Sequence, residues 1–110
     1  VDRRGESASR VAVVLINWRH VEETLRCLVE LRDCGHATLS VLVIDNGSHD
    51  GSAERLQADG GSVQLLLLEH NVGYCRAVNL GIEWAREQAA DYVLLLNNDV
   101  ELPEDFLPVE

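Results

Sequence analysis

The hydrophobic residues of this chain gather in four short runs, and each run ends at polar side chains. The runs cover residues 11–16, 39–44, 63–68 and 92–96, and the polar positions that follow them are Asn17, Asp45, Asn46, residues 69–71 and residues 97–99. Continuous apolar runs of this length indicate strands that are buried on both faces, as in parallel sheets. Ligands of such sheets bind beyond the carboxyl ends of the strands. We therefore expect the polar chemistry of the chain to lie along one edge of a sheet.

Between these runs, apolar residues recur at helical intervals. The spacing predicts helices over residues 20–33, 53–58 and 74–90, and a further helix that starts near Pro103. Gly35 is expected to end the first helix, and Ser and Asp side chains of the preceding loop are expected to cap the second. Gly81 costs the third helix about 1 kcal/mol relative to Ala, so its presence there indicates close packing against the sheet.

Strands and helices alternate along the chain, and this order defines the fold class. The pattern β-α-β-α-β-α-β predicts an α/β fold, with a Rossmann-like, mainly parallel sheet and helices on both faces. Residues 1–10 are polar and are expected to form a flexible leader. Residues 11–110 are expected to form one domain that is incomplete at its C-terminus.

The charge of the chain excludes several partners. Nineteen acidic side chains face nine basic ones, which gives a net charge of −10, and all nine basic residues are Arg. Such a surface repels nucleic acid and anionic lipid, so we expect neither as a partner. We find no apolar run long enough for a membrane helix and no signal peptide. Cys27, Cys34 and Cys75 show no paired spacing, so we expect them to be reduced and mostly buried in a cytoplasmic protein.

Two acidic positions at the expected sheet edge have the chemistry of a ligand site. Asp45 suits the acceptor of a hydrogen bond from a ribose hydroxyl or a base N–H, although Asp45 and Asp50 also suit the capping of turns and of a helix. Asn97 and Asp99 offer one amide oxygen and one carboxylate to a hard divalent cation. Mg²⁺ and Mn²⁺ often take one or two protein carboxylates and complete their shell with water and phosphate oxygens.

Arg76 and Trp18 each fit two roles. Arg76 stands at the start of the third expected helix, where a guanidinium would help backbone N–H groups to bind an anion or would simply be solvated. Trp18 follows the first strand, where it would pack or would border a base pocket. A dinucleotide-dependent oxidoreductase is close to excluded, because the G-x-G-x-x-G turn is missing after the first strand.

Four segments in order resemble one enzyme family. They are VVLINW at 13–18, VIDNGSHDGS at 43–52, NVGY at 71–74 with NLGI at 79–82, and YVLLLNND at 92–99. Together they resemble the nucleotide-binding half of a family 2 glycosyltransferase with the GT-A fold, in its rhamnosyltransferase-like branch. The resemblance implies that the nucleotide sugar is bound by Asn17, Trp18, Asp45, Asn46, Ser48, Asn71, Gly73, Asn97 and Asn98. It also implies that Asp99 holds Mg²⁺ or Mn²⁺ against the diphosphate.

The same resemblance implies the reaction. The intact protein would move a sugar from a UDP- or dTDP-linked donor to the hydroxyl of a sugar or lipid-linked acceptor, with inversion, in cell-wall or polysaccharide biosynthesis. Rhamnosyl transfer at the inner face of the membrane would fit this branch. The general base is expected outside this chain, so the chain alone should be inactive, and its exposed apolar edge should favour self-association. Asn97 replaces the first Asp of the family's D-x-D, which keeps a non-catalytic nucleotide-sugar-binding or interaction module open as the alternative.

Overall fold

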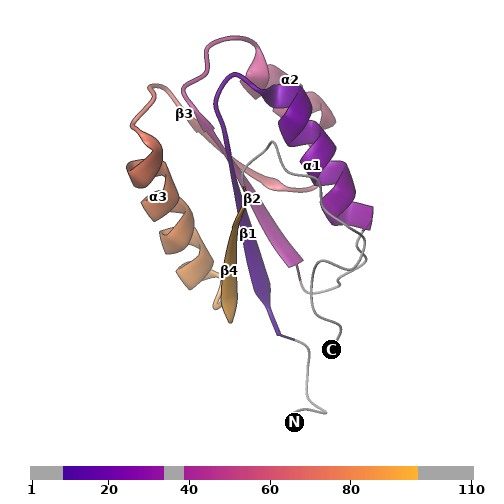
Figure 1. Cartoon of the computed structure of the whole chain (residues 1–110), viewed down its shortest axis with the longest axis vertical. Coiled ribbons are helices and arrows are strands. Elements are labelled where there is room, and N and C mark those ends of the chain that lie inside the picture. The colour runs from indigo at the N-terminus through magenta and orange to yellow at the C-terminus, as the bar shows by residue number, and fades with distance from the viewer. Residues whose placement is uncertain (1–8, 34–38, 97–110) are drawn as a thin grey trace.

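A computed structural model describes residues 9–33 and 39–96 of the chain (Figure 1). Its elements are β1 (Val11–Asn17), α1 (Val21–Asp33), β2 (Leu39–Asn46), α2 (Ser52–Asp59), β3 (Gln64–Leu68), α3 (Tyr74–Glu87) and β4 (Tyr92–Leu96). The strands and helices expected within these residues are confirmed. Several predicted features lie outside the described residues. They are most of the leader, Cys34, Gly35, residues 97–99 and the helix expected near Pro103.

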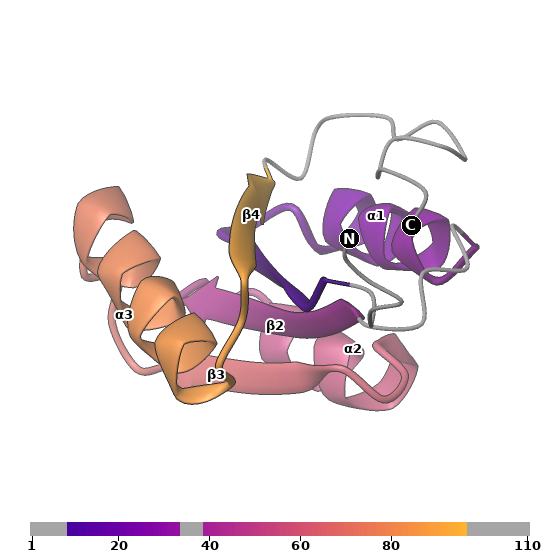
Figure 2. The ribbon, with the colours of Figure 1, turned by 90° about the horizontal axis from the view of Figure 1, so that it is seen from below.

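The four strands form one parallel sheet in the order β3-β2-β1-β4. In its register Asn17 of β1 pairs with Asp45 of β2, Asp45 pairs with Leu67 of β3, and Leu15 of β1 pairs with Leu96 of β4. Helices α1 and α2 cover one face and α3 covers the other, as Figures 1 and 2 show. The predicted α/β fold, a Rossmann-like parallel sheet with helices on both faces, is confirmed, and it is consistent with the GT-A fold.

β1 lies inside the sheet and contributes to both hydrophobic clusters of the domain. Its Val13 and Leu15 pack with residues of α1 and α2 on one face, while Val14 packs with Ala77 of α3 on the other. Gly81 of α3 is buried against this second face, and a Cβ there would lie 2.5 Å from Cγ1 of Val14. The close approach of α3 to the sheet, expected from Gly81, is confirmed.

Three local details differ from the sequence-based expectation or refine it. α3 ends at Glu87 rather than at residue 90, because Ala89 adopts a left-handed φ of 56° that no helix continues through. Cys27 is buried as expected, but Cys75 is exposed, since it lies on the side of α3 opposite Ala77. Exposed apolar side chains do lie on β4, at Val93 and Leu95, at one edge of the described sheet. Self-association through them stays a prediction.

Within the described residues, no helix is long and apolar enough to cross a membrane.

Candidate functional site

The carboxyl ends of the parallel strands bring the candidate residues to one edge of the sheet. β1 ends at Asn17, β2 at Asn46, β3 at Leu68 and β4 at Leu96. The loops that follow β1, β2 and β3 meet at this edge, and most of the residues singled out in the sequence lie in them or at the strand ends.

Asn17, Asp45 and Ser48 form a buried hydrogen-bonded cluster together with Thr24 of α1. Asn17 Nδ2 donates to Asp45 Oδ1 at 2.9 Å and lies 3.4 Å from Ser48 Oγ, while the Ser48 hydroxyl donates to the same Asp45 oxygen at 2.6 Å. Thr24 Oγ1 lies 2.7 Å from Asn17 Oδ1. All four residues are at least 97% buried. The cluster fixes the Asp45 carboxylate at the edge of the sheet.

One oxygen of this carboxylate remains available. Both hydrogen bonds go to Oδ1, and no described residue bonds to Oδ2. Asp45 is only 3% exposed, and leaving a buried carboxylate oxygen without a donor is costly. Asp45 also lines a pocket of about 440 Å³, together with His49, Gly51, Ala53, Glu54, Leu67 and Leu68. A ligand N–H or O–H in this pocket would supply the missing donor.

Asn46 joins the loop after β2 to the loop after β3. Its Oδ1 accepts from the Val72 backbone N–H at 3.0 Å, and its Nδ2 donates to the Gly73 carbonyl at 3.3 Å. Asn71 stays within its own loop, where its Oδ1 accepts from the Gly73 N–H at 2.8 Å. The ring of His49 adds a hydrogen bond to the Glu69 carbonyl. The two loops therefore form one continuous surface.

Gly47 allows these two loops to touch. It adopts a φ of +73°, and a Cβ there would come within 2.8 Å of His70 Cα and closer still to the His70 carbonyl carbon and the Asn71 nitrogen. No side chain fits this position without moving the backbone.

Trp18 is exposed at this edge, so it is not part of the buried core. The residue is 44% exposed, and the guanidinium of Arg19 lies over its ring, 4.8 Å from the centroid. Arg19 is itself held by Ser48, since its N–H donates to Ser48 Oγ at 2.9 Å and its Nε donates to the Ser48 carbonyl at 3.1 Å. An aromatic face and a cation thus lie next to the buried cluster.

The expected side-chain cap of α2 is wrong, because its N-cap is Gly51, which has no side chain to donate or accept. Asp50 instead closes the turn before the helix, which was one of the roles considered for the acidic residues. Its Oδ1 accepts from both the backbone N–H and the hydroxyl of Ser52, the first residue of α2. The hydroxyl of Ser52 is the main cause that lowers the pKa of the Asp50 carboxyl from its usual range. Asp45 instead bonds to side chains, including one from a neighbouring strand.

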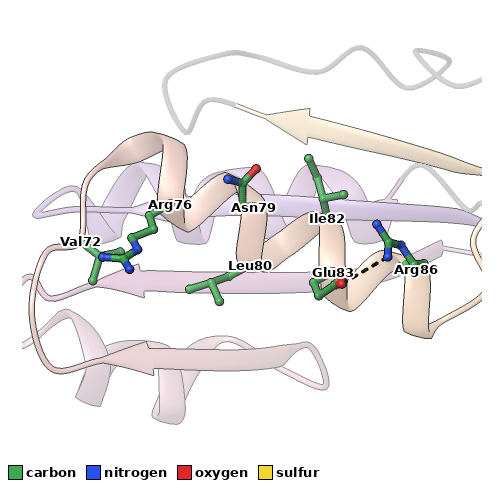
Figure 3. A pocket seen from close by; sticks show the side chains of 7 residues that line it. All are labelled: Val72, Arg76, Asn79, Leu80, Ile82, Glu83 and Arg86. Atoms are coloured by element: carbon green, nitrogen blue, oxygen red, sulfur yellow. Dashed lines mark ion pairs between the residues drawn. The ribbon is translucent and has the colours of Figure 1, made fainter.

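Arg76 does not line this pocket. It lines a groove of about 530 Å³ on the outer side of α3, with Val72, Asn79, Leu80, Ile82, Glu83 and Arg86 (Figure 3). The groove shares no lining residue with the pocket at Asp45. An anion-binding role for Arg76 therefore finds no support from the geometry of the edge.

The expected metal residue lies outside the described part of the chain. Residues 9–33 and 39–96 contain no group of three or more His, Cys, Asp and Glu side chains that would hold a metal ion. Asn97, Asn98 and Asp99 follow Leu96 directly but are not described. The binding of Mg²⁺ or Mn²⁺ by Asp99 therefore stays a prediction.

Thr24 was missed in the sequence. We judged this helix from its apolar positions alone. The available signal was the spacing of Thr24, which places it on the same helix face as Cys27, Leu28 and Leu31, the residues buried with it in the structure.

Comparison with known proteins adds independent information. The sequence profile described as "Glycosyl transferase family 2" matches residues 12–109. The undecaprenyl-phosphate 4-deoxy-4-formamido-L-arabinose transferase of Pseudomonas aeruginosa (strain LESB58) is 36% identical over 72 residues, which are 62% of this chain and 20% of that protein. The dTDP-rhamnosyl transferase RfbF of Shigella flexneri is 26% identical over 100 residues, which are 90% of this chain and 32% of that protein. The chain thus spans about a fifth to a third of the length of these relatives.

Proposed function

This chain belongs to glycosyl transferase family 2, and we propose that it is the donor-binding part of an inverting transferase that uses a nucleoside-diphosphate sugar. The intact protein would move the sugar to an acceptor hydroxyl. Two relatives support this proposal by their names, since one transfers a rhamnosyl group from a dTDP-linked form and the other carries an arabinose derivative and undecaprenyl phosphate in its name. Rhamnosyl transfer to a polysaccharide or glycolipid is the specific reaction we propose.

The Asp45 carboxylate carries the proposal. A carboxylate accepts hydrogen bonds and donates none, and Oδ1 already accepts from Asn17 and Ser48. Oδ2 therefore suits a ligand that offers a single N–H or O–H. Uracil and thymine each present one imide N–H, and ribose presents hydroxyl groups, so a uridine or deoxythymidine nucleotide matches this acceptor.

The neighbouring residues have different parts in this proposal. Trp18 offers an exposed ring to the base or sugar, and Asn71 and Gly73 border the nucleotide. Asn17, Asn46 and Ser48 act indirectly, because their polar side chains already bond within the protein. They hold Asp45 and the two loops in place.

The diphosphate of the donor is negatively charged, and the chain itself has a net charge of −10, so binding requires a source of positive charge. β4 ends at Leu96, which pairs with Leu15 two residues before Asn17, so the chain leaves the described strands at the same edge as Asp45. We propose that Asp99, with Asn97 and Asn98 beside it in sequence, holds Mg²⁺ or Mn²⁺ there. When bound, the cation would stabilise the charge of the leaving nucleoside diphosphate.

Calorimetric titration with UDP and with dTDP, each with and without Mn²⁺, tests the proposal. In Asp45→Asn, the amide oxygen still accepts from Asn17 and Ser48, but an NH₂ group replaces Oδ2 and faces the ligand donor. We expect this variant to fold and to bind at least about tenfold more weakly, which is the loss of one hydrogen bond to a charged group.

Asp99→Ala distinguishes the two functions that the sequence leaves open, a metal-dependent donor site of a transferase and a non-catalytic binding module. We expect it to abolish the metal-dependent part of binding. Binding that persists unchanged in Asp99→Ala and without metal would instead favour a non-catalytic binding module. Unchanged affinity in Asp45→Asn would remove Asp45 from the site.

A further inference from the structure

Thr24 is a buried polar residue for which the sequence predicted no role. It lies at the end of the first turn of α1 and is fully buried, and two acceptors of the described residues lie close to its Oγ1. Asn17 Oδ1 lies at 2.7 Å and the His20 carbonyl at 3.2 Å. A hydroxyl has one proton, so Thr24 donates to one of them.

The charge of Asp45 decides which of these two oxygens accepts the Thr24 proton. Asp45 accepts only, so Asn17 must present its NH₂ group to Oδ1 at 2.9 Å, because a flipped amide would bring two oxygens together. This orientation turns Asn17 Oδ1 toward Thr24. Two acceptors do not bond to each other, and Thr24 therefore donates its proton to Asn17. The hydrogen bonds therefore run in one direction, because Thr24 donates to Asn17 and Asn17 donates to Asp45.

We propose that Thr24 is a positioning residue for the donor pocket, acting through Asn17 to fix the Asp45 carboxylate with Oδ2 left for the ligand. The effect on ligand binding rests on the proposed function, whereas the effect on Asn17 does not. Ser48 holds Asp45 Oδ1 from the other side, and its hydroxyl in turn accepts from the Arg19 N–H. Asp45 still selects the orientation of the Asn17 amide without the Thr24 proton, but the buried Asn17 Oδ1 then loses this donor. The amide that donates to Asp45 is therefore held less firmly.

Hydrogen exchange of the Asn17 side-chain amide, followed by NMR, tests the first step without a ligand. We expect slow exchange in the wild-type chain and in Thr24→Ser, which keeps the hydroxyl. In Thr24→Val we expect exchange at least about tenfold faster, as the loss of one hydrogen bond predicts. Cys27→Ala controls for destabilisation, because Cys27 is buried on the same helix but packs in the hydrophobic cluster. Equal acceleration in Thr24→Val and Cys27→Ala would overturn the role of Thr24.

Calorimetry with UDP and with UDP methylated at N3 of the base tests the second step. Methylation removes the imide proton, so the wild-type chain should prefer UDP, and this preference should shrink about tenfold in Thr24→Val and return in Thr24→Ser. A preference that is the same in all three proteins would show that Thr24 does not act on the ligand. A wild-type chain that binds neither nucleotide would remove the proposed function, and the exchange measurement would still decide whether Thr24 orients Asn17.

Discussion

Replacing Gly47 by Ala should separate the two loops that form the candidate site. The left-handed φ of +73° costs an Ala residue about 1–2 kcal/mol. The added Cβ also collides with the backbone at His70 and Asn71, and overpacking of this kind costs about 1–3 kcal/mol more. The expected loss of about 2–5 kcal/mol is a large part of the total stability of about 5–15 kcal/mol for a domain of this kind.

Gly51→Ala is the matched control. Gly51 has a similar φ of +90°, but a Cβ there has no atom within 4 Å in the described structure. It therefore pays the backbone cost alone. The difference between the two variants, about 1–3 kcal/mol, isolates the contact between the loops.

Thermal unfolding followed by circular dichroism measures this difference. We expect Gly47→Ala to melt about 4–12 °C below Gly51→Ala, at roughly 4 °C per kcal/mol for this chain length. Equal melting temperatures would refute the contact between the loops after β2 and β3.

Two further predictions concern the core and the turn that precedes α2. Gly81→Ala should destabilise the chain by up to about 2 kcal/mol in urea unfolding, because overpacking against Val14 outweighs a gain in helix propensity of about 1 kcal/mol. In a chain that already carries Val14→Ala, the same change should no longer be destabilising. The Asp50 carboxyl has a pKa lowered by Ser52, so it contributes stability above the usual Asp pKa and loses it as the pH falls through the lowered value. An NMR titration of Asp50 should show a low midpoint that rises in Ser52→Ala, and an unchanged midpoint would contradict the hydrogen bond from the Ser52 hydroxyl.

The strands and the position of Asp45 could be predicted because both depend on local sequence. Continuous apolar runs identify strands buried on both faces, and the residue that follows such a strand lies at the carboxyl edge of the sheet. The family resemblance likewise rests on short segments and is confirmed by a match over residues 12–109.

The bonding partners could not be predicted, because they join residues far apart in the chain. Asn46 bonds to a loop 26 and 27 residues later, and Asn17 bonds to Asp45 28 residues later. The sequence showed polar residues at the edge, but not that Asn17 and Ser48 face Asp45 while Trp18 faces solvent. That distinction depends on how α1 and the loop after β2 pack over the ends of the strands.

The most direct test of the donor site is an NMR titration of this chain with UDP and Mg²⁺, in which each backbone amide reports where the nucleotide lies. We expect the amide signals of residues 17–19, 45–51 and 71–73 to shift, and those of the outer side of α3 from Arg76 to Arg86 to remain. Shifts confined to the α3 groove, or no shift at the edge around Asp45, would contradict the account.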